Sequence, residues 1–161
     1  MAQPTWRLIV EKKSVPDPAN VAWTPVLDYA IPGKLLKIVV VNQNGDPDPA
    51  RTWQPKDFAG ACSADGDLEG KLGPKLPGSA LFSSAPRGAL IGRIAGSTAE
   101  NVLEAAPSGT NPSRLTFAVG RFCVLLVPTS PVGALYLAVN DSPERMGAVT
   151  NPLLVNIYEA L

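Results

Sequence analysis

The stretch that decides the fold reads Gly133-Ala-Leu-Tyr-Leu-Ala-Val-Asn-Asp141, an apolar run that ends in two polar residues. Similar short runs lie before and after it, separated by segments rich in Gly, Pro, Asn, Asp or Ser. Runs of this length and composition, bounded by such residues, are typical of β-strands. The pattern predicts strands over residues 6–11, 24–29, 35–41, 89–94, 115–119, 122–127, 134–139 and 153–158.

The composition favours the same fold class. Of 161 residues, 45% are hydrophobic and only 17% are charged, which excludes a disordered chain. The 17 Pro and 14 Gly leave little room for long helices. We therefore expect residues 1–161 to form a single all-β domain, a two-sheet antiparallel β-sandwich.

One segment, residues 42–87, has almost no hydrophobic periodicity and is crowded with Pro, Gly and Asp. It is far longer than an ordinary connection between strands. Loops of this size are usually functional, and this one has few large apolar side chains, Trp53 among them. We expect a long irregular loop that packs over one end of the sandwich.

Four runs of the last third carry a further signal, together with the Ile31-Pro-Gly33 turn and the strand after it. These runs are Gly88-Ala-Leu-Ile-Gly-Arg-Ile94, Phe122-Cys-Val-Leu-Leu-Val127, Gly133-Ala-Leu-Tyr-Leu-Ala-Val-Asn-Asp141 and Leu153-Leu-Val-Asn-Ile157. In them the chain resembles the bacterial calcium-dependent galactose-binding lectins. The resemblance implies a galactose-binding-domain-like sandwich of the lectin type, a galactose-type carbohydrate or glycoconjugate as ligand, and a homo-oligomer, a tetramer in that family.

In these lectins calcium is held by protein oxygen atoms, and sugar hydroxyls complete its coordination. The resemblance places Asn140 and Asp141 at two of the ligand positions. Aligned without a gap, the remaining positions fall on Arg145, Ala148 and Val149, whose side chains cannot bind calcium. The site implied by the resemblance is therefore degenerate in this register.

An alignment shifted by two or three residues brings Thr150 and Asn151 into the vacant ligand positions. The metal ligands are then Asp141, Thr150 and Asn151, and calcium is the cation implied. Sequence leaves both alignments open, so calcium binding and a calcium-free site are alternative expectations.

The implied sugar site combines two loop segments, 42–53 and 140–151. Trp53 could stack on a sugar ring or anchor the long loop in the core. Arg145 could pair with Asp141 and donate hydrogen bonds to sugar hydroxyls. The other interpretation of Asn140-Asp141 is a turn whose side chains bond to local backbone. The expected sugar-binding residues are Asp141, Asn140, Arg145, Trp53 and Asn151.

Other function classes are disfavoured. Equal numbers of basic and acidic residues give zero formal charge, without the basic surface that nucleic acid requires. The chain has no His, hence no His-based catalytic triad and no His-ligated zinc, and no paired carboxylates at a defined spacing. We expect a protein that is not an enzyme. The alternative to a lectin-like protein is a protein-interaction or structural module that has lost sugar binding.

The N-terminal residues lack the pattern of a Sec signal peptide, and no apolar run is long enough to span a membrane. The expected location is therefore the cytoplasm, or the exterior after export without a Sec signal peptide.

Overall fold

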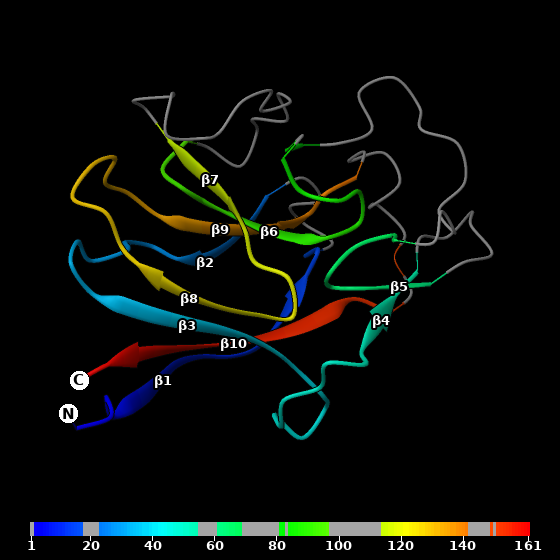
Figure 1. Ribbon diagram of the computed structural model, residues 1–161, viewed down its shortest axis with the longest axis horizontal. Coiled ribbons are helices and arrows are strands. Elements are labelled where there is room, and N and C mark those ends of the chain that lie inside the picture. The colour runs from blue at the N-terminus through cyan, green and yellow to red at the C-terminus, as the bar shows by residue number, and fades with distance from the viewer. Residues whose placement is uncertain are drawn as a thin grey trace.

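Two four-stranded antiparallel sheets face each other in the computed structural model, with the N- and C-termini side by side at one end (Figure 1). The structure describes residues 2–17, 23–54, 61–68, 81–82, 84–96, 114–141, 149 and 151–161. The first sheet has the order β1 (Trp6–Val15), β10 (Leu153–Ala160), β3 (Leu35–Val41), β8 (Phe122–Leu126). The second has the order β2 (Thr24–Leu27), β9 (Leu135–Val139), β6 (Leu90–Ile94), β7 (Leu115–Ala118). The prediction of an all-β, two-sheet antiparallel sandwich is confirmed.

All eight predicted strands are present, with ends that differ from the predicted ones by a few residues. The segment 42–87 is less irregular than predicted, because it contains the two-stranded sheet of β4 (Thr52–Trp53) and β5 (Cys62–Ser63). Strands of two residues carry no periodicity, so the sequence pattern could not show them. The described residues form no helix, and none of them belongs to a membrane-spanning helix.

The core lies between the sheets and follows the period of two along each strand. In β3 the residues that face inward are Leu36, Ile38 and Val40, exposed by 3%, 0% and 2%. In the second sheet Leu90 and Leu137 face them from β6 and β9. This shared cluster joins strands from both halves of the chain into one packed interior.

Described residues near the end of the long loop pack on the outer face of the second sheet. Leu81 and Phe82 pack there against Ile91 of β6 and Ala138 of β9, and Trp23 belongs to the same buried cluster. This cover buries Ile91, whereas Leu90 and Ile94 belong to the core between the sheets, so every residue of β6 is buried.

Two glycines turn the chain between elements. Gly33 has a φ of 79°, and Lys34 N–H donates to the Ile31 carbonyl over 3.2 Å, which confirms the predicted Ile31-Pro-Gly turn. Gly120 has a φ of 66° and lies between β7 in one sheet and β8 in the other. At this positive φ an L side chain is strained, so the crossing between the sheets favours glycine.

We predict that shortening Ile38 destabilises the fold in proportion to the volume removed. Ile38 is 0% exposed, so Ile38→Val should lower the free energy of unfolding by about 0.5–1.5 kcal/mol and Ile38→Ala by about 2–5 kcal/mol. Leu35→Ala on the same strand is the control, because Leu35 is already 36% exposed and should cost less than half as much. Urea denaturation measures all three, and equal losses for Ile38→Ala and Leu35→Ala would contradict the assigned core.

Candidate functional site

The predicted sugar-binding residues that the structure describes lie at the end of the sandwich opposite the termini, which we call the loop end (Figure 1). There Asn140 follows β9 and its side chain is fully buried. Its Oδ1 accepts hydrogen bonds from the N–H groups of Leu81 and Phe82, both over 2.8 Å. Its Nδ2 donates to the carbonyls of Phe82, Ala85 and Pro86 over 2.7, 3.0 and 3.2 Å. Asn140 therefore bonds to a distant part of the long loop, whereas its predicted roles were sugar binding or a local turn.

Asp141 is also 0% exposed, and it faces a cation. The Arg87 guanidinium donates from Nε to Oδ1 over 3.3 Å and from Nη2 to Oδ2 over 3.5 Å. A buried carboxylate needs such a partner, because an unpaired charge in the interior is strongly unfavourable. Arg87, which sequence reasoning missed, is thus the described cation that pairs with Asp141.

The strand order explains why Arg87 and Asp141 meet. β6 and β9 pair antiparallel, with Leu90 opposite Val139. Residues just before β6 and just after β9 therefore meet at the same end of the sheet. Had this pairing been predicted, the charges of Arg87 and Asp141 would have pointed to each other.

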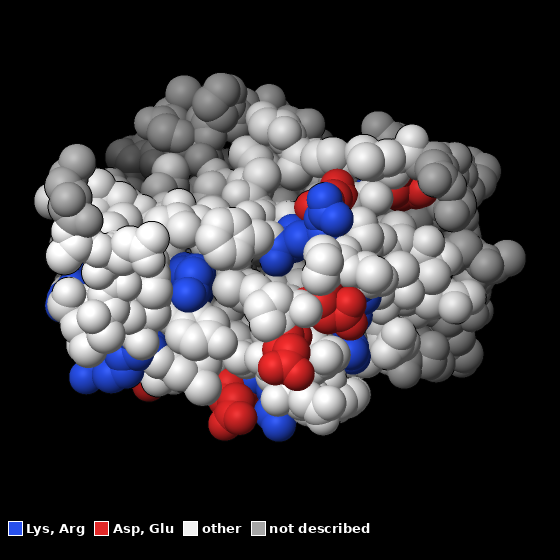
Figure 2. Space-filling model, turned by 60° about the horizontal axis from the view of Figure 1, so that its bottom comes forward, with Lys and Arg blue, Asp and Glu red and all other residues white. Residues whose placement is uncertain are grey.

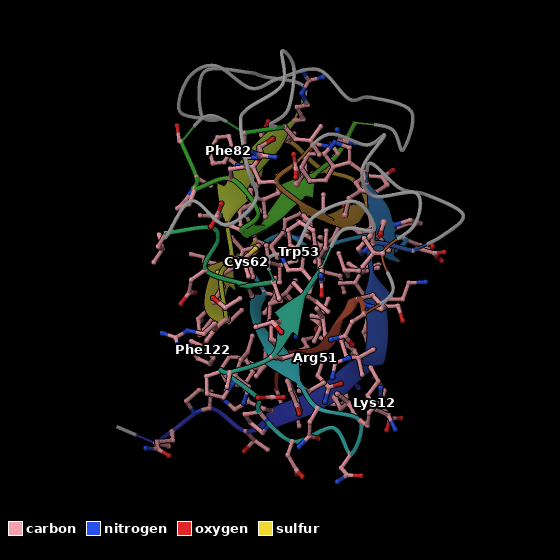
Figure 3. All side chains as sticks on the ribbon, turned by 90° about the vertical axis from the view of Figure 1, so that its right-hand side faces the viewer. Lys12, Arg51, Trp53, Cys62, Phe82 and Phe122 are labelled. Carbon is pink, nitrogen blue, oxygen red and sulfur yellow. The ribbon has the colours of Figure 1, made fainter. Side chains whose placement is uncertain are left out.

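Trp53 is 0% exposed, and its indole Nε1 donates to the Gly88 carbonyl over 2.9 Å. The prediction that its ring stacks on a sugar is wrong for this structure, because no face of the ring reaches solvent. Trp53 instead anchors the long loop in the main core, the alternative that the scarcity of apolar residues in that loop suggested. Figure 3 shows Trp53 and Cys62 close together in the interior.

Of the remaining predicted site residues, the structure describes only Asn151. Asn151 is exposed at the loop end, where its Nδ2 donates to the Thr52 carbonyl over 3.0 Å. Arg145 and Thr150 lie outside the described residues. The structure thus brings Asn140, Asp141 and Trp53 to one end of the molecule, but in internal contacts.

A hollow of about 250 Å³ opens beside these residues, and we call it the loop-end hollow. Its lining consists of Thr52, Ala61, Cys62, Ser63, Gly66, Asp67 and Leu68. Gly66 has a φ of 101°, and an added Cβ would approach Pro86 to 2.7 Å. The main chain of Asp67 is held by a 2.7 Å hydrogen bond from its N–H to the Arg87 carbonyl. The hollow therefore combines oxygen-bearing side chains with a fixed backbone.

The polar groups that the structure describes at the predicted calcium position already bond within the chain. The Asp141 carboxylate faces a guanidinium, and both polar atoms of the Asn140 amide bond to backbone groups. No group of three or more His, Cys, Asp or Glu suited to a metal occurs in the part of the chain that the structure describes. The calcium ligand set with Thr150 stays a prediction.

A second hollow, of about 180 Å³, lies near the termini and is lined by Ile9, Leu27, Tyr29, Ile31, Lys34, Leu36 and Glu159. Its carboxylate is already paired, since Glu159 lies 2.8 Å from Arg7 Nη2 and 3.5 Å from Lys34 Nζ. The hydrogen bond from Arg7 lowers the pKa of Glu159. Glu159 is therefore already engaged by two cations at this end of the molecule.

Comparison of the chain with protein-family models, curated proteins and solved structures gives no match.

We predict that Asn140 stabilises the fold more than an exposed amide does. Asn140→Asp keeps the shape but replaces the NH₂ donors with an acceptor beside three carbonyls, and it adds a buried charge next to Asp141. It should lower the free energy of unfolding by at least about 3 kcal/mol. The matched control, Asn151→Asp, loses a single exposed hydrogen bond and should cost less than about 1 kcal/mol. Similar values from urea denaturation would contradict the structural role of Asn140.

We predict a stability loss at alkaline pH that depends on Cys62. Burial raises the pKa of this thiol from 9.0 to about 12, the carboxylates of Asp67 and Asp141 add to the rise, and Arg87 and a hydrogen bond with Trp53 oppose it. Above about pH 9 the unfolded chain loses this proton while the folded chain keeps it, so stability falls as pH rises.

Cys62→Ala should therefore lose less stability than the unchanged protein between about pH 8 and about pH 10, measured by urea denaturation in reductant. Both proteins share every other titrating group, so the difference isolates Cys62. Identical slopes would show that the thiol is not held protonated in the fold.

Proposed function

We propose that the chain is a non-catalytic carbohydrate-binding protein that holds a galactose-type sugar in the loop-end hollow. The observation that carries the proposal is the meeting of Thr52, Ser63 and Asp67 around one hollow. Carboxylates accept hydrogen bonds from sugar hydroxyls, and Ser and Thr hydroxyls both donate and accept. A few polar groups placed around a concave surface are the usual basis of small-ligand recognition.

The residues beneath the hollow support binding by keeping its lining in place. Trp53 follows Thr52 and ties β4 to Gly88, and it pairs across the small sheet with Cys62. The Arg87 carbonyl fixes the backbone of Asp67. A lining that is already ordered loses little entropy when a ligand binds, which favours affinity from few contacts.

In this mechanism the carboxylate of Asp67 accepts hydrogen bonds from two neighbouring sugar hydroxyls. The hydroxyl of Ser63 forms a further hydrogen bond with the sugar. The exposed side chain of Leu68 (75%) offers an apolar surface to the C–H face of the ring. Asn140, Asp141 and Trp53 act indirectly, by holding the hollow in shape.

The second candidate is a protein-interaction or structural module that has lost sugar binding. The observation that favours it is the burial of Asn140, Asp141 and Trp53, three residues expected at the sugar site. A module of this kind should respond to neither sugar nor calcium.

We predict that galactose raises the melting temperature in EDTA, because a ligand that binds only the folded state stabilises it by about 2.7 kcal/mol at a hundred times its dissociation constant. Asp67→Asn should weaken binding by roughly ten- to a hundredfold, the value of a hydrogen bond to a charged group. Asp46→Asn is the control, since Asp46 is an exposed loop residue outside the hollow.

Two comparisons complete the test. Glucose in place of galactose measures selectivity for the sugar, and calcium in place of EDTA tests the cation predicted from the lectin resemblance. Absence of any shift with sugars, in calcium or in EDTA, would reject carbohydrate binding and favour the interaction module. A galactose shift that Asp67→Asn leaves unchanged would place the sugar elsewhere.

A further inference from the structure

β8 forms one edge of the first sheet, and nothing in its sequence protects that edge. The strand reads Phe122-Cys-Val-Leu-Leu126 and contains neither a charge nor a proline. Its register with β3 is regular, from Leu35 opposite Leu126 to Val39 opposite Phe122. An edge strand that is regular, apolar and uncharged is a template for pairing with another chain.

The other edges differ from β8 in this respect. β1 carries Arg7, Glu11, Lys12 and Lys13, and its pairing with β10 is interrupted twice by register shifts. β2 contains Pro25 and has a register shift of its own. Charges, prolines and bulges are the features by which proteins block edge pairing. β7 is only four residues long, so β8 is the longest unprotected edge among the described strands.

The unpaired main-chain groups of β8 belong to Phe122, Val124 and Leu126. At the two ends of the ladder with β3, Val40 N–H donates to the Arg121 carbonyl and Val127 N–H donates to the Lys34 carbonyl. Hydrogen-bonded positions alternate in an antiparallel ladder, so the odd-numbered residues of β8 bond to β3. The even-numbered residues direct N–H and C=O groups to the free edge.

The side chains of the same three residues are exposed. Phe122, Val124 and Leu126 are 58%, 47% and 61% exposed, and Figure 3 shows Phe122 at the margin of the molecule. They lie on the outer face of the first sheet, a side that Figure 2 shows as largely white with scattered charged groups. Exposed apolar side chains in a row mark an interaction surface.

Lys37 of β3 is a cation on the outer face of the first sheet, and its ammonium group lies away from the free edge of β8. Lys37 of β3 lies directly opposite Val124, but its Nζ stands over the rings of Trp6 and Tyr158, 4.7 and 4.5 Å from their centroids. These rings hold the ammonium toward β1 and β10. Lys37 therefore does not place its charge beside the apolar row of β8.

We propose that β8 pairs antiparallel with β8 of a second copy of this chain, about a twofold axis at Val124. In this register Val124 lies opposite Val124 of the copy, and Phe122 lies opposite Leu126. Each pair exchanges both of its main-chain hydrogen bonds, because all three residues already direct these groups to the edge. Only apolar side chains face one another, so no like charges meet at the axis.

The dimer goes beyond the proposed function, because β8 contributes no residue to the loop-end hollow. Its readouts are mass and hydrogen exchange, which do not depend on sugar. A negative result for the dimer therefore leaves the sugar-binding proposal untouched, and a negative result for sugar binding leaves the dimer proposal untouched.

The first test uses the unchanged protein. Sedimentation velocity should show a species of twice the 16.9 kDa chain mass that dissociates on dilution. Hydrogen exchange followed by NMR should show amides of Phe122, Val124 and Leu126 gaining protection as concentration rises, while those of Cys123 and Leu125, bonded to β3, stay protected throughout. A monomer at every concentration, or even-numbered amides that exchange freely in the dimer, would overturn the proposal.

The second test fixes the register. Val124→Lys and Val124→Glu should each abolish the dimer, since like charges then meet at the axis. An equimolar mixture of the two variants should restore it. Leu8→Lys is the matched control, because Leu8 is 42% exposed on the opposite edge, where it lies across from Tyr158. Dimers that survive both Val124 substitutions, a mixture that stays monomeric, or dissociation by Leu8→Lys would each overturn pairing through β8.

Discussion

The loop end depends on one buried amide. Asn140 sits where β9 leaves the sheet, and its side chain bonds to the backbone of residues 81–86, more than fifty positions earlier in the chain. A buried amide left without partners costs about 1–3 kcal/mol for each unmet group, so the side chain and the loop segment require each other. Because this segment also covers the outer face of the second sheet, the same contacts close the core cluster around Ile91.

Because the loop end depends on Asn140, we interpret the consecutive residues Asn140 and Asp141 as structural residues and not as sugar ligands. A residue that contacts a sugar must offer polar atoms to solvent, whereas both of these side chains are 0% exposed and bonded within the chain. The Arg87–Asp141 pair adds charges that balance each other in the interior. The loop end therefore uses Asn140 and Asp141 for internal order, and the sugar site that we propose lies at the neighbouring residues that line the hollow. There Trp53, next to Thr52, is tied to the Gly88 carbonyl, and the N–H of Asp67 donates to the Arg87 carbonyl.

The sequence predicted what is local in this fold and missed what is distant. All eight long strands and the turn at Gly33 follow from alternation and from the backbone preferences of Pro and Gly, which act within a few residues. The partner of Asp141 could not be predicted, because Arg87 lies 54 residues away and meets it only through the pairing of β6 with β9. For Trp53 the composition of the loop suggested a core anchor as one of two roles. Its hydrogen-bond partner, the distant Gly88 carbonyl, was not visible in the sequence around residue 53.

The apolar residues on the outer faces of the two sheets are covered to different extents. Only 17% of the residues are charged, below the roughly 25% of an ordinary soluble domain, so the chain has few ionic side chains with which to cover its surface. On the second sheet the chain covers the outer face itself, with Leu81, Phe82 and Trp23. On the first sheet the small cluster of Val39, Val41 and Leu154 is buried, but the row along β8 stays exposed. β8 keeps its apolar side chains and its main-chain groups exposed, whereas β1 is charged and bulged. The dimer that we propose explains this difference, because β8 of the second copy would cover both the side chains and the main-chain groups.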